Sequence, residues 1–204
     1  MNLLQCFNQF DIILASQSPR RKALLENADI PFRVEVRPTP EIFSGNLAPV
    51  DVVRLLCREK ARCFSEELKD NRVVVIAADT IVVHKGQIIN KPEDAEHAFN
   101  MLSTLSGDTH EVYTGVCIRH RSEELVFYDH SLVTFREFTP DEIWYYVRNY
   151  APFDKAGAYG IQDWIGTVGI TKIEGSHHNV MGLPVHMLYT RLKEMLCQIS
   201  SVSP

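Results

Sequence analysis

The stretch "RVVVIAADTIVVHKGQII", residues 72–89, predicts the centre of a β-sheet. Two runs of β-branched residues flank Asp79, and β-branched side chains favour strands. The Lys85-Gly86 pair then predicts a turn that joins these runs to a short partner strand. We therefore expect this stretch to lie in the central sheet of the fold.

Helix and strand patterns continue on both sides of this stretch. Before it, the chain predicts a strand, a helix, a strand and a helix at about 11–15, 19–28, 32–36 and 49–68. After it, a helix begins at Pro92 and stops at Gly107, and strands follow as an antiparallel pair at about 111–119 and 126–137. Helices at about 140–149 and 184–198 enclose a glycine-rich segment. This order predicts a mixed α/β fold.

The composition narrows the class of protein. The chain has 204 residues, 45% of them hydrophobic, and a formal net charge of -5. That length suits one well-cored domain, and no repeat, low-complexity tract or linker divides it, so we expect a single domain over residues 1–204. The negative charge argues against a surface that coats nucleic acid or anionic membrane. Any charge that binds phosphate must therefore be local.

The cysteines and the first residues indicate a cytoplasmic protein. The five cysteines contain no CxxC pair, which favours reduced, packed thiols over a disulfide framework or a zinc site. The opening "MNLLQCFNQFD" lacks the basic region of a secretory signal. No apolar run approaches the length that would cross a membrane.

Two arginines stand where a helix is expected to begin, in "ASQSPRRKALLE", residues 15–26. Ser18 is the predicted N-cap and Pro19 the first helical residue, which places Arg20 and Arg21 in the first turn. A helix N-terminus carries partial positive charge, so arginines are unfavourable there unless an anion such as phosphate binds. From this stretch alone, an anion site and a pair of solvent-exposed arginines are both open.

Asp79 is the second chemical signal. A carboxylate within an apolar strand is costly to bury unless it is hydrogen-bonded, protonated or bound to a metal. The alternative is a strand end at which the carboxylate emerges and caps a turn. Because apolar residues continue from Ile81 to Val83, we favour a functional role for Asp79.

Two lysines and a glycine-rich loop are weaker signals. Lys60 stands on a helix and is expected on a solvated face, whereas Lys91 precedes a helix start and is placed to share an anion with it. The glycines of "FDKAGAYGIQDWIG", residues 153–166, suit either a close approach to a ligand or a structural loop. The chain contains neither GxxxxGK[ST] nor GxGxxG, so phosphate-loop and Rossmann classes lose their usual support.

Other constellations favour packing over chemistry. The adjacent His177 and His178 have no third ligand at metal spacing and no GxSxG elbow beside them, so we expect loop histidines. The aromatic stretch "IWYYVRNY" is most simply an amphipathic helix that packs Trp144, and not a base-stacking platform.

Seven segments in chain order resemble the Maf family of nucleoside triphosphate pyrophosphatases. They cover nearly the whole chain and are "ILASQSPRRKALLE", "REKA", "AADTIVV", "NKPEDAEHAFNMLSTLSG", "HEVYTGVCI", "FDKAGAYGIQ" and "IEGSHHNVMGLPV". The family belongs to a wider fold group that includes inosine triphosphatases. The resemblance therefore implies a two-lobed α/β fold with an elongated mixed sheet and a central cleft. Within the family, "AADT" with "KAGAYGIQ" resembles the branch acting on dTTP and UTP, rather than the branch associated with 7-methyl-GTP.

The resemblance also implies an activity and the residues that perform it. The activity is hydrolysis of dTTP and UTP, with modified pyrimidine nucleotides in the same range, to the monophosphate and pyrophosphate. Asp79 matches the catalytic base, and the specificity positions match Arg20, Thr80 and Gln162. The other polar site positions match Ser16, Arg21, Glu41, Lys60 and Lys91. Glu41 and Asp79 would hold a divalent cation, Mg²⁺ or alternatively Mn²⁺.

Chemistry makes sense of these roles. The arginines would clamp a triphosphate and the lysines would add positive charge during cleavage, while Ser16 donates to the same oxygens. Asp79 would take a proton from the attacking water. The amide of Gln162 both donates and accepts hydrogen bonds, which matches the imide edge of uracil or thymine.

Three positions depart from the family pattern. Pro40-Glu41 stands where an acidic pair is common, Asn90 replaces a glycine, and Ala151 occupies a place that is often acidic. None of the three removes a proposed catalytic group.

Two other classes of function stay open beside the enzyme. A nucleotide-binding regulator, linked to septum formation or cell division, would keep the phosphate clamp without significant turnover. A scaffold protein would leave Asp79 unexplained. The resemblance also leads us to expect a homodimer, and the net charge predicts no stable nucleic-acid or membrane partner.

Overall fold

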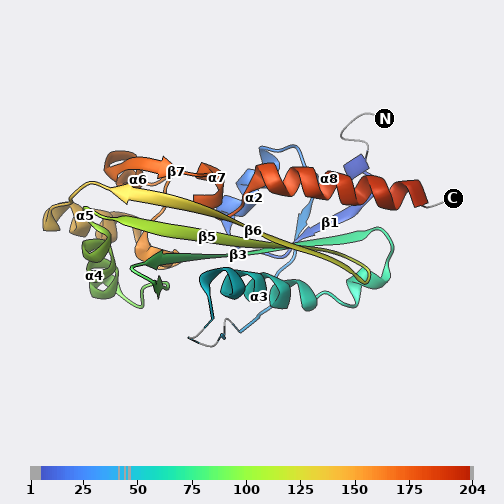
Figure 1. Ribbon diagram of the computed structural model, residues 1–204, viewed down its shortest axis with the longest axis horizontal. Coiled ribbons are helices and arrows are strands. Elements are labelled where there is room, and N and C mark those ends of the chain that lie inside the picture. The colour runs from blue at the N-terminus through green and yellow to red at the C-terminus, as the bar shows by residue number, and fades with distance from the viewer. Residues whose placement is uncertain (1–5, 41, 44, 46, 203–204) are drawn as a thin grey trace. The chain divides into compact units, whose positions relative to one another are not determined.

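The computed structural model describes residues 6–40, 42–43, 45 and 47–202 (Figure 1). The strands are β1 (Asp11–Leu14), β2 (Arg33–Val34), β3 (Val73–His84), β4 (Gln87–Ile89), β5 (Thr109–His120), β6 (Glu123–Phe135) and β7 (Ile170–Glu174). The helices are α2 (Pro19–Glu26), α3 (Pro49–Arg62), α4 (Ala95–Leu105), α5 (Pro140–Tyr150), α6 (Trp164–Gly169), α7 (His177–Val180) and α8 (Val185–Val202). Two 3₁₀ turns lie at Glu67–Lys69 and Ala156–Ala158.

The strands form one mixed seven-stranded sheet, in the order β2-β1-β3-β5-β6-β7, with β4 paired to β3. β1 is parallel to β2 and β3, whereas β3–β4 and β6–β7 are antiparallel. β5 and β6 are neighbours joined by a two-residue turn, a connection that only antiparallel strands allow. The predicted α/β class, the antiparallel pair and the central place of β3 are confirmed.

The chain divides into two compact units. The first comprises residues 1–79, 115–128 and 182–204, and the second comprises residues 80–114 and 129–181. β3, β5 and β6 contribute to both units, and β3 passes from the first to the second between Asp79 and Thr80. Two units agree with the two lobes that the resemblance implies, while the central cleft stays a prediction.

The core of the first unit lies between its strands and α3. Alternate residues of a strand point to the same face, and Val75 and Ala77 of β3 contact Cys57 and Ala61 of α3 on that face. α8 lies on the other side of these strands (Figure 1). A Cβ at Gly115 would lie 2.4 Å from the carbonyl oxygen of Val53, so glycine allows α3 to approach β5 closely.

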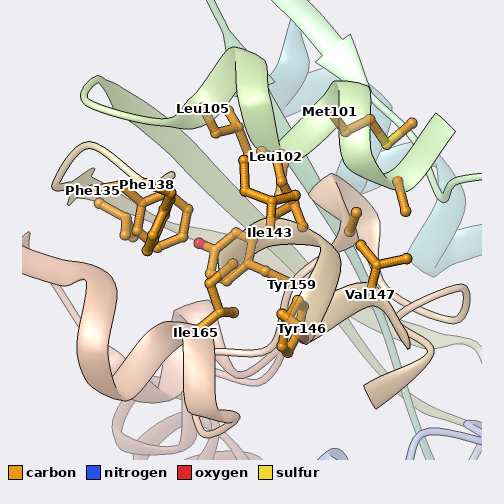
Figure 2. Close-up of a cluster of buried hydrophobic side chains, with 14 of the residues drawn as sticks. Met101, Leu102, Leu105, Phe135, Phe138, Ile143, Tyr146, Val147, Tyr159 and Ile165 are labelled. Carbon is orange, nitrogen blue, oxygen red and sulfur yellow. The ribbon is translucent and has the colours of Figure 1, made fainter. Parts of the chain in front are cut away.

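The core of the second unit is an apolar cluster that α4 and α5 cover (Figure 2). Leu102 and Leu105 of α4 meet Ile143 of α5 in this cluster, with Tyr159 among them. Trp144 stacks on Phe99 at 4.7 Å between ring centroids and an interplanar angle of 16°. The predicted packing of Trp144 on an amphipathic helix is confirmed.

Several helix boundaries differ from the predicted ones. α4 begins at Ala95 and not at Pro92, because the carboxylate of Asp94 accepts a hydrogen bond from the His97 backbone and caps the helix there. α3 ends at Arg62, six residues before the predicted end, and a 3₁₀ turn follows it. The Lys85-Gly86 turn forms as predicted, with φ of 50° and 78°.

The glycine-rich segment holds more structure than predicted. It contains α6, β7 and α7, and α7 includes His177 and His178, which the sequence had placed in a loop. α7 forms because Ser176 accepts a hydrogen bond from the Asn179 backbone at the helix start. The short apolar pattern of β7 carries too few alternating residues to be distinguished from a loop.

The cysteines are unpaired thiols, as predicted. All five lie within the described residues and none forms a disulfide. Among the helices of the described residues, none combines the length and the apolar character needed to span a membrane.

Candidate active site

The start of α2 presents Ser16 and Arg21 together. Ser16 is 8% exposed, and its Oγ accepts hydrogen bonds from the Ser18 backbone and from Arg21 Nη1, both at 3.2 Å. Arg21 Nε donates to the carbonyl oxygen of Gly182 at 2.7 Å. These bonds fix the Arg21 guanidinium beside the helix start. Because a hydroxyl carries one proton, Ser16 still has a donor to offer while it accepts both bonds.

Arg20 lies half-buried in the first turn of α2. Pro19 begins the helix as predicted, and Ser18 occupies the N-cap position, but its side chain makes no capping hydrogen bond. No acidic residue stands in this turn. The positive end of α2 therefore carries two arginines and no carboxylate, which suits an anion.

Asp79 and Lys60 form an ion pair in the first unit. Lys60 Nζ donates to Asp79 Oδ1, and the two side chains are only 19% and 9% exposed. The expectation of a solvated Lys60 is wrong, because α3 packs on the face of β3 that carries Asp79. A buried carboxylate beside an ammonium group places a proton acceptor and a positive charge at one point.

The face of α3 that carries Lys60 also carries a buried cysteine close to Asp79. Cys57 lies one helical turn before Lys60 and is fully buried. Burial raises the pKa of the Cys57 thiol above its ordinary value, and the charges of Cys117 and Asp79 raise it further. The Cys57 thiol therefore stays neutral and adds no negative charge beside Asp79, whose charge is balanced by Lys60.

Thr80 follows Asp79 directly and belongs to the second unit. Its Oγ1 lies 2.9 Å from Thr114 Oγ1 on the neighbouring strand β5. Thr114 in turn donates to the backbone carbonyl of Asn179, in α7, at 3.0 Å. Thr114 and Asn179 are both 0% exposed, so this hydroxyl pair is anchored in the interior of the unit.

Gln162 stands exposed on a tightly constrained loop of the second unit. The hydroxyl of Tyr146 accepts from the Gly160 backbone at 3.1 Å and donates to Asp163 Oδ2 at 2.7 Å, on either side of Gln162. A Cβ at Gly160 would lie 2.5 Å from that same oxygen. Burial, then the Asp163 carboxylate, raises the pKa of Tyr146, so its phenol keeps the proton that it donates. The amide of Gln162 is therefore presented from a fixed backbone.

Lys91 is exposed in the segment that leads to α4. The preceding residue, Asn90, accepts a hydrogen bond from the Gly157 backbone at 3.1 Å. Gly157 has φ of 71°, and a Cβ there would meet Val82 at 3.0 Å. Glycine is thus required at position 157 by both conformation and space, and its backbone N–H bonds the residue directly before Lys91.

The predicted residues are therefore distributed over both units. Ser16 joins Arg21, and Lys60 joins Asp79, in the first unit. The second unit holds Thr80, Lys91 and Gln162, whereas Glu41 lies outside the described residues.

Sequence patterns did not single out the residues that support the site. Thr114 and Asn179 lie within the quoted segments "HEVYTGVCI" and "IEGSHHNVMGLPV", but a buried hydroxyl or amide has no pattern of its own. The same is true of Tyr146 and Asp163, which hold the loop of Gln162. Each is tied to the site only by its hydrogen bonds in the fold.

Among the described site residues, the Asp79 carboxylate offers the oxygen atoms that a hard divalent cation prefers. The described residues contain no cluster of three or more histidine, cysteine or acidic side chains that would form a complete metal site. Mg²⁺ does not need such a cluster, since it binds through one or two carboxylates together with substrate phosphates and water. The buried Asp79 carboxylate supplies oxygen ligands of the required kind.

Comparisons with known proteins identify the family of this chain. The family model described as "Maf-like protein" matches residues 11–195. A relative named dTTP/UTP pyrophosphatase, from Porphyromonas gingivalis strain ATCC 33277, is 48% identical over 94% of this chain and 98% of its own. Another of that name, from Christiangramia forsetii, is 45% identical over 95% of this chain and 98% of its own.

A solved structure is also similar to this chain. It is the structure of the Staphylococcus aureus Ham1 protein, at 15% identity and a TM-score of 0.49, over 91% of this chain and 99% of that one. The fold assignment rests on the described strands and on the family match, which spans most of the sequence. The chain belongs to the Maf family.

Proposed function

We propose that this chain is a nucleoside triphosphate pyrophosphatase that hydrolyses dTTP and UTP to the monophosphate and pyrophosphate. The observation that carries the proposal is Asp79, a 6%-exposed carboxylate in an apolar strand, paired with Lys60. The relatives named dTTP/UTP pyrophosphatase support the choice of reaction and substrates. Modified pyrimidine nucleotides fall in the same substrate class.

The phosphates would bind at the start of α2. Backbone N–H groups at a helix N-terminus attract anions, and guanidinium groups form bidentate bonds with phosphate oxygens. Arg20 and Arg21 lie in this turn, and Ser16 has a hydroxyl proton to donate. Lys60 and Lys91 would supply further positive charge as the α–β phosphate bond breaks.

Asp79 would act as the general base. It would accept a proton from a water that attacks the α-phosphorus, and pyrophosphate would leave. The reaction consumes one water and yields the nucleoside monophosphate, pyrophosphate and a proton. Lys60, already bonded to Asp79 Oδ1, orients the carboxylate before substrate binds.

Asp79 and Glu41 would hold the divalent cation, Mg²⁺ or alternatively Mn²⁺. When bound, such a cation neutralises phosphate charge and lowers the pKa of bound water. The oxygen chemistry of the two carboxylates supports this choice over softer metals.

Base selection would fall to Thr80 and Gln162, together with Arg20. The Gln162 amide can donate to a carbonyl and accept from the imide N–H of uracil or thymine. A base with the opposite donor pattern would leave buried polar groups unpaired, which weakens its transition-state binding. The rigid backbone on both sides of Gln162 supports this role, because a preorganised amide discriminates better than a mobile one.

The proposal also covers the setting of the enzyme. We place it in the cytoplasm as a homodimer without a stable nucleic-acid or membrane partner. The free cysteines support a reducing compartment, and the net charge of -5 disfavours polyanion binding.

The test is pyrophosphate release by the purified chain from dTTP, UTP, CTP, ATP and GTP, with Mg²⁺ and with a chelator. We expect release from dTTP and UTP in preference to the others, and loss of release with the chelator. Binding of dTTP without release of pyrophosphate from any nucleotide would contradict the proposal and favour a nucleotide-binding regulator.

A further inference from the structure

A buried chain of hydrogen bonds lies behind Thr80 in the second unit. Thr80 Oγ1 and Thr114 Oγ1 are 2.9 Å apart, and Thr114 Oγ1 is 3.0 Å from the backbone carbonyl oxygen of Asn179. Thr80 is half-buried, whereas the other two residues are 0% exposed. This series of hydrogen bonds therefore runs from the half-buried Thr80 into the core of the unit.

The carbonyl at the inner end fixes the direction of every proton in this chain. A carbonyl oxygen only accepts, so the bond between Thr114 and Asn179 must use the Thr114 hydroxyl proton. Each hydroxyl has one proton, which means that Thr114 can only accept in its contact with Thr80. The proton of that contact comes from Thr80, and any further group that meets Thr80 Oγ1 meets an acceptor.

Asn179 is held firmly enough to impose this direction. Its Nδ2 donates to the Val112 carbonyl at 3.0 Å and to Ser131 Oγ at 2.9 Å, and its backbone N–H donates to Ser176 Oγ at 3.3 Å. Turning its carbonyl away would leave the buried Thr114 hydroxyl without an acceptor, which is costly. The polarity of Thr80 is thus set by residues that need not touch a ligand.

We propose that Thr114, anchored by the Asn179 carbonyl, is a positioning residue that makes Thr80 a hydrogen-bond acceptor for the imide N–H of uracil and thymine. The inference rests on the proposed function, in which Thr80 faces the base. The imide N–H is the ring donor that these two bases share, whereas cytosine has a lone pair at that position. An acceptor at Thr80 would therefore favour UTP and dTTP over CTP, and the Gln162 amide would then donate to a base carbonyl, since the imide has only one N–H proton to give.

Thr114→Val breaks this series of hydrogen bonds with little change in side-chain volume. Thr80 then loses Thr114 as the acceptor that fixes the direction of its proton, and its hydroxyl can donate to a base instead. We expect the ratio of kcat/KM for UTP to that for CTP to fall about tenfold, the discrimination that one neutral hydrogen bond of about 1.4 kcal/mol supports. Thr114→Ser keeps the hydroxyl and should retain the wild-type ratio.

Ser131→Ala is the matched control. It removes another buried partner of Asn179 but leaves both hydroxyls of the chain in place. It should lower the melting temperature, as Thr114→Val also does, without changing the UTP/CTP ratio. Specificity and stability are thereby separated, since a merely structural role for Thr114 would give the two variants the same ratio.

The outcomes separate this inference from the proposed function. If the wild-type enzyme prefers UTP and the UTP/CTP ratio of kcat/KM is unchanged in Thr114→Val, the inference is overturned and the proposed function stands. An equal fall in kcat/KM for UTP and CTP in Thr114→Val overturns the inference too, because the lost interaction would then not involve the imide N–H of the base. A wild-type chain that releases no pyrophosphate from any nucleotide overturns the proposed function and the inference together.

Discussion

In the first unit most of the candidate residues carry charge, Ser16 being the neutral one, whereas in the second they are mostly neutral. The first unit contains Arg20, Arg21, Lys60 and Asp79. The side chains of Lys60 and Asp79 form an ion pair that is largely shielded from solvent. The second unit contributes the hydroxyl of Thr80 and the amide of Gln162, with Lys91 as its charged member. β3 passes from one set to the other between two adjacent residues, Asp79 and Thr80.

This difference matches the two tasks of a nucleotide hydrolase. Phosphates are recognised and cleaved through charge, and the strength of these interactions does not depend on which base is attached. Bases differ in donors and acceptors, which neutral groups of fixed polarity distinguish. The comparison leads us to expect that changes at Lys60 and Asp79 of the first unit alter rate and stability, and that changes at Thr80 and Gln162 of the second alter selectivity.

Asp79→Asn should have the largest effect on turnover. An amide cannot accept a proton near neutral pH and is a poor ligand for a hard cation, so we expect kcat to fall by about 10² to 10⁴. Binding of dTTP should persist, because the arginines and lysines remain. Pyrophosphate release and calorimetric binding on one preparation measure both quantities. A folded Asp79→Asn with near-normal kcat would exclude Asp79 as the base, while the exposed Asp141→Asn serves as control.

Lys60→Met should have the largest effect on stability. It leaves the 9%-exposed Asp79 side chain without its cation, and breaking a buried pair in this way costs about 3 to 5 kcal/mol. Lys69→Met is the matched control, because its pair with Glu66 is 72% and 77% exposed and is worth about 1 kcal/mol or less. Urea unfolding measures both changes. Equal losses in the two variants would contradict the buried character of the Lys60–Asp79 pair.

The second unit contains no such buried ion pair among its described candidate residues, but it buries a histidine in the neutral form. His110 is 1% exposed and its Nε2 lies 2.8 Å from the Tyr159 hydroxyl. Burial lowers the pKa of His110 to about 3, the charge of His84 adds to this, and Asp108 opposes it. The unfolded chain takes up the proton near pH 6.5 and the folded chain does not, so stability is fully present above that pH and is lost as the pH falls toward 3.

His110→Gln tests this pH dependence with a side chain that still bonds Tyr159 but does not titrate. Between pH 7 and pH 5 the wild type should lose about 2 kcal/mol more unfolding free energy than this variant. Urea unfolding at the two pH values gives the difference, with the exposed His186→Gln as control. Equal losses in wild type and His110→Gln would show that His110 is not the group responsible.

The sequence predicted the elements that have strong local signals. β-branched runs located β3, and the Lys85-Gly86 turn located β4, because both are consequences of local backbone preference. The start of α4 was misplaced because proline and the capping residue Asp94 both suit a helix start, and the Asp94 hydrogen bond determined it. β7 and α7 depend on partners such as Leu132 and Ser131, which are distant in sequence.

The site was predictable only in part for the same reason. Asp79 was noticeable because a charge in an apolar run is unfavourable without a partner. The identity of that partner was not predictable, since Lys60 on an amphipathic helix has the ordinary pattern of a solvated residue. The protons of Thr80 and Thr114 acquire a direction only from the carbonyl of Asn179, 65 residues further along the chain.

The most direct test of the division between the units compares Lys60→Gln with Gln162→Glu. For each variant, kcat/KM is measured for dTTP, UTP, CTP, ATP and GTP. We predict that Lys60→Gln lowers all five values by a similar factor and leaves their ratios unchanged. Gln162→Glu loses the amide donors and should reduce the preference for dTTP and UTP by about tenfold, as expected for one unsatisfied buried partner. Altered ratios in Lys60→Gln, or an unchanged preference in Gln162→Glu, would contradict the account.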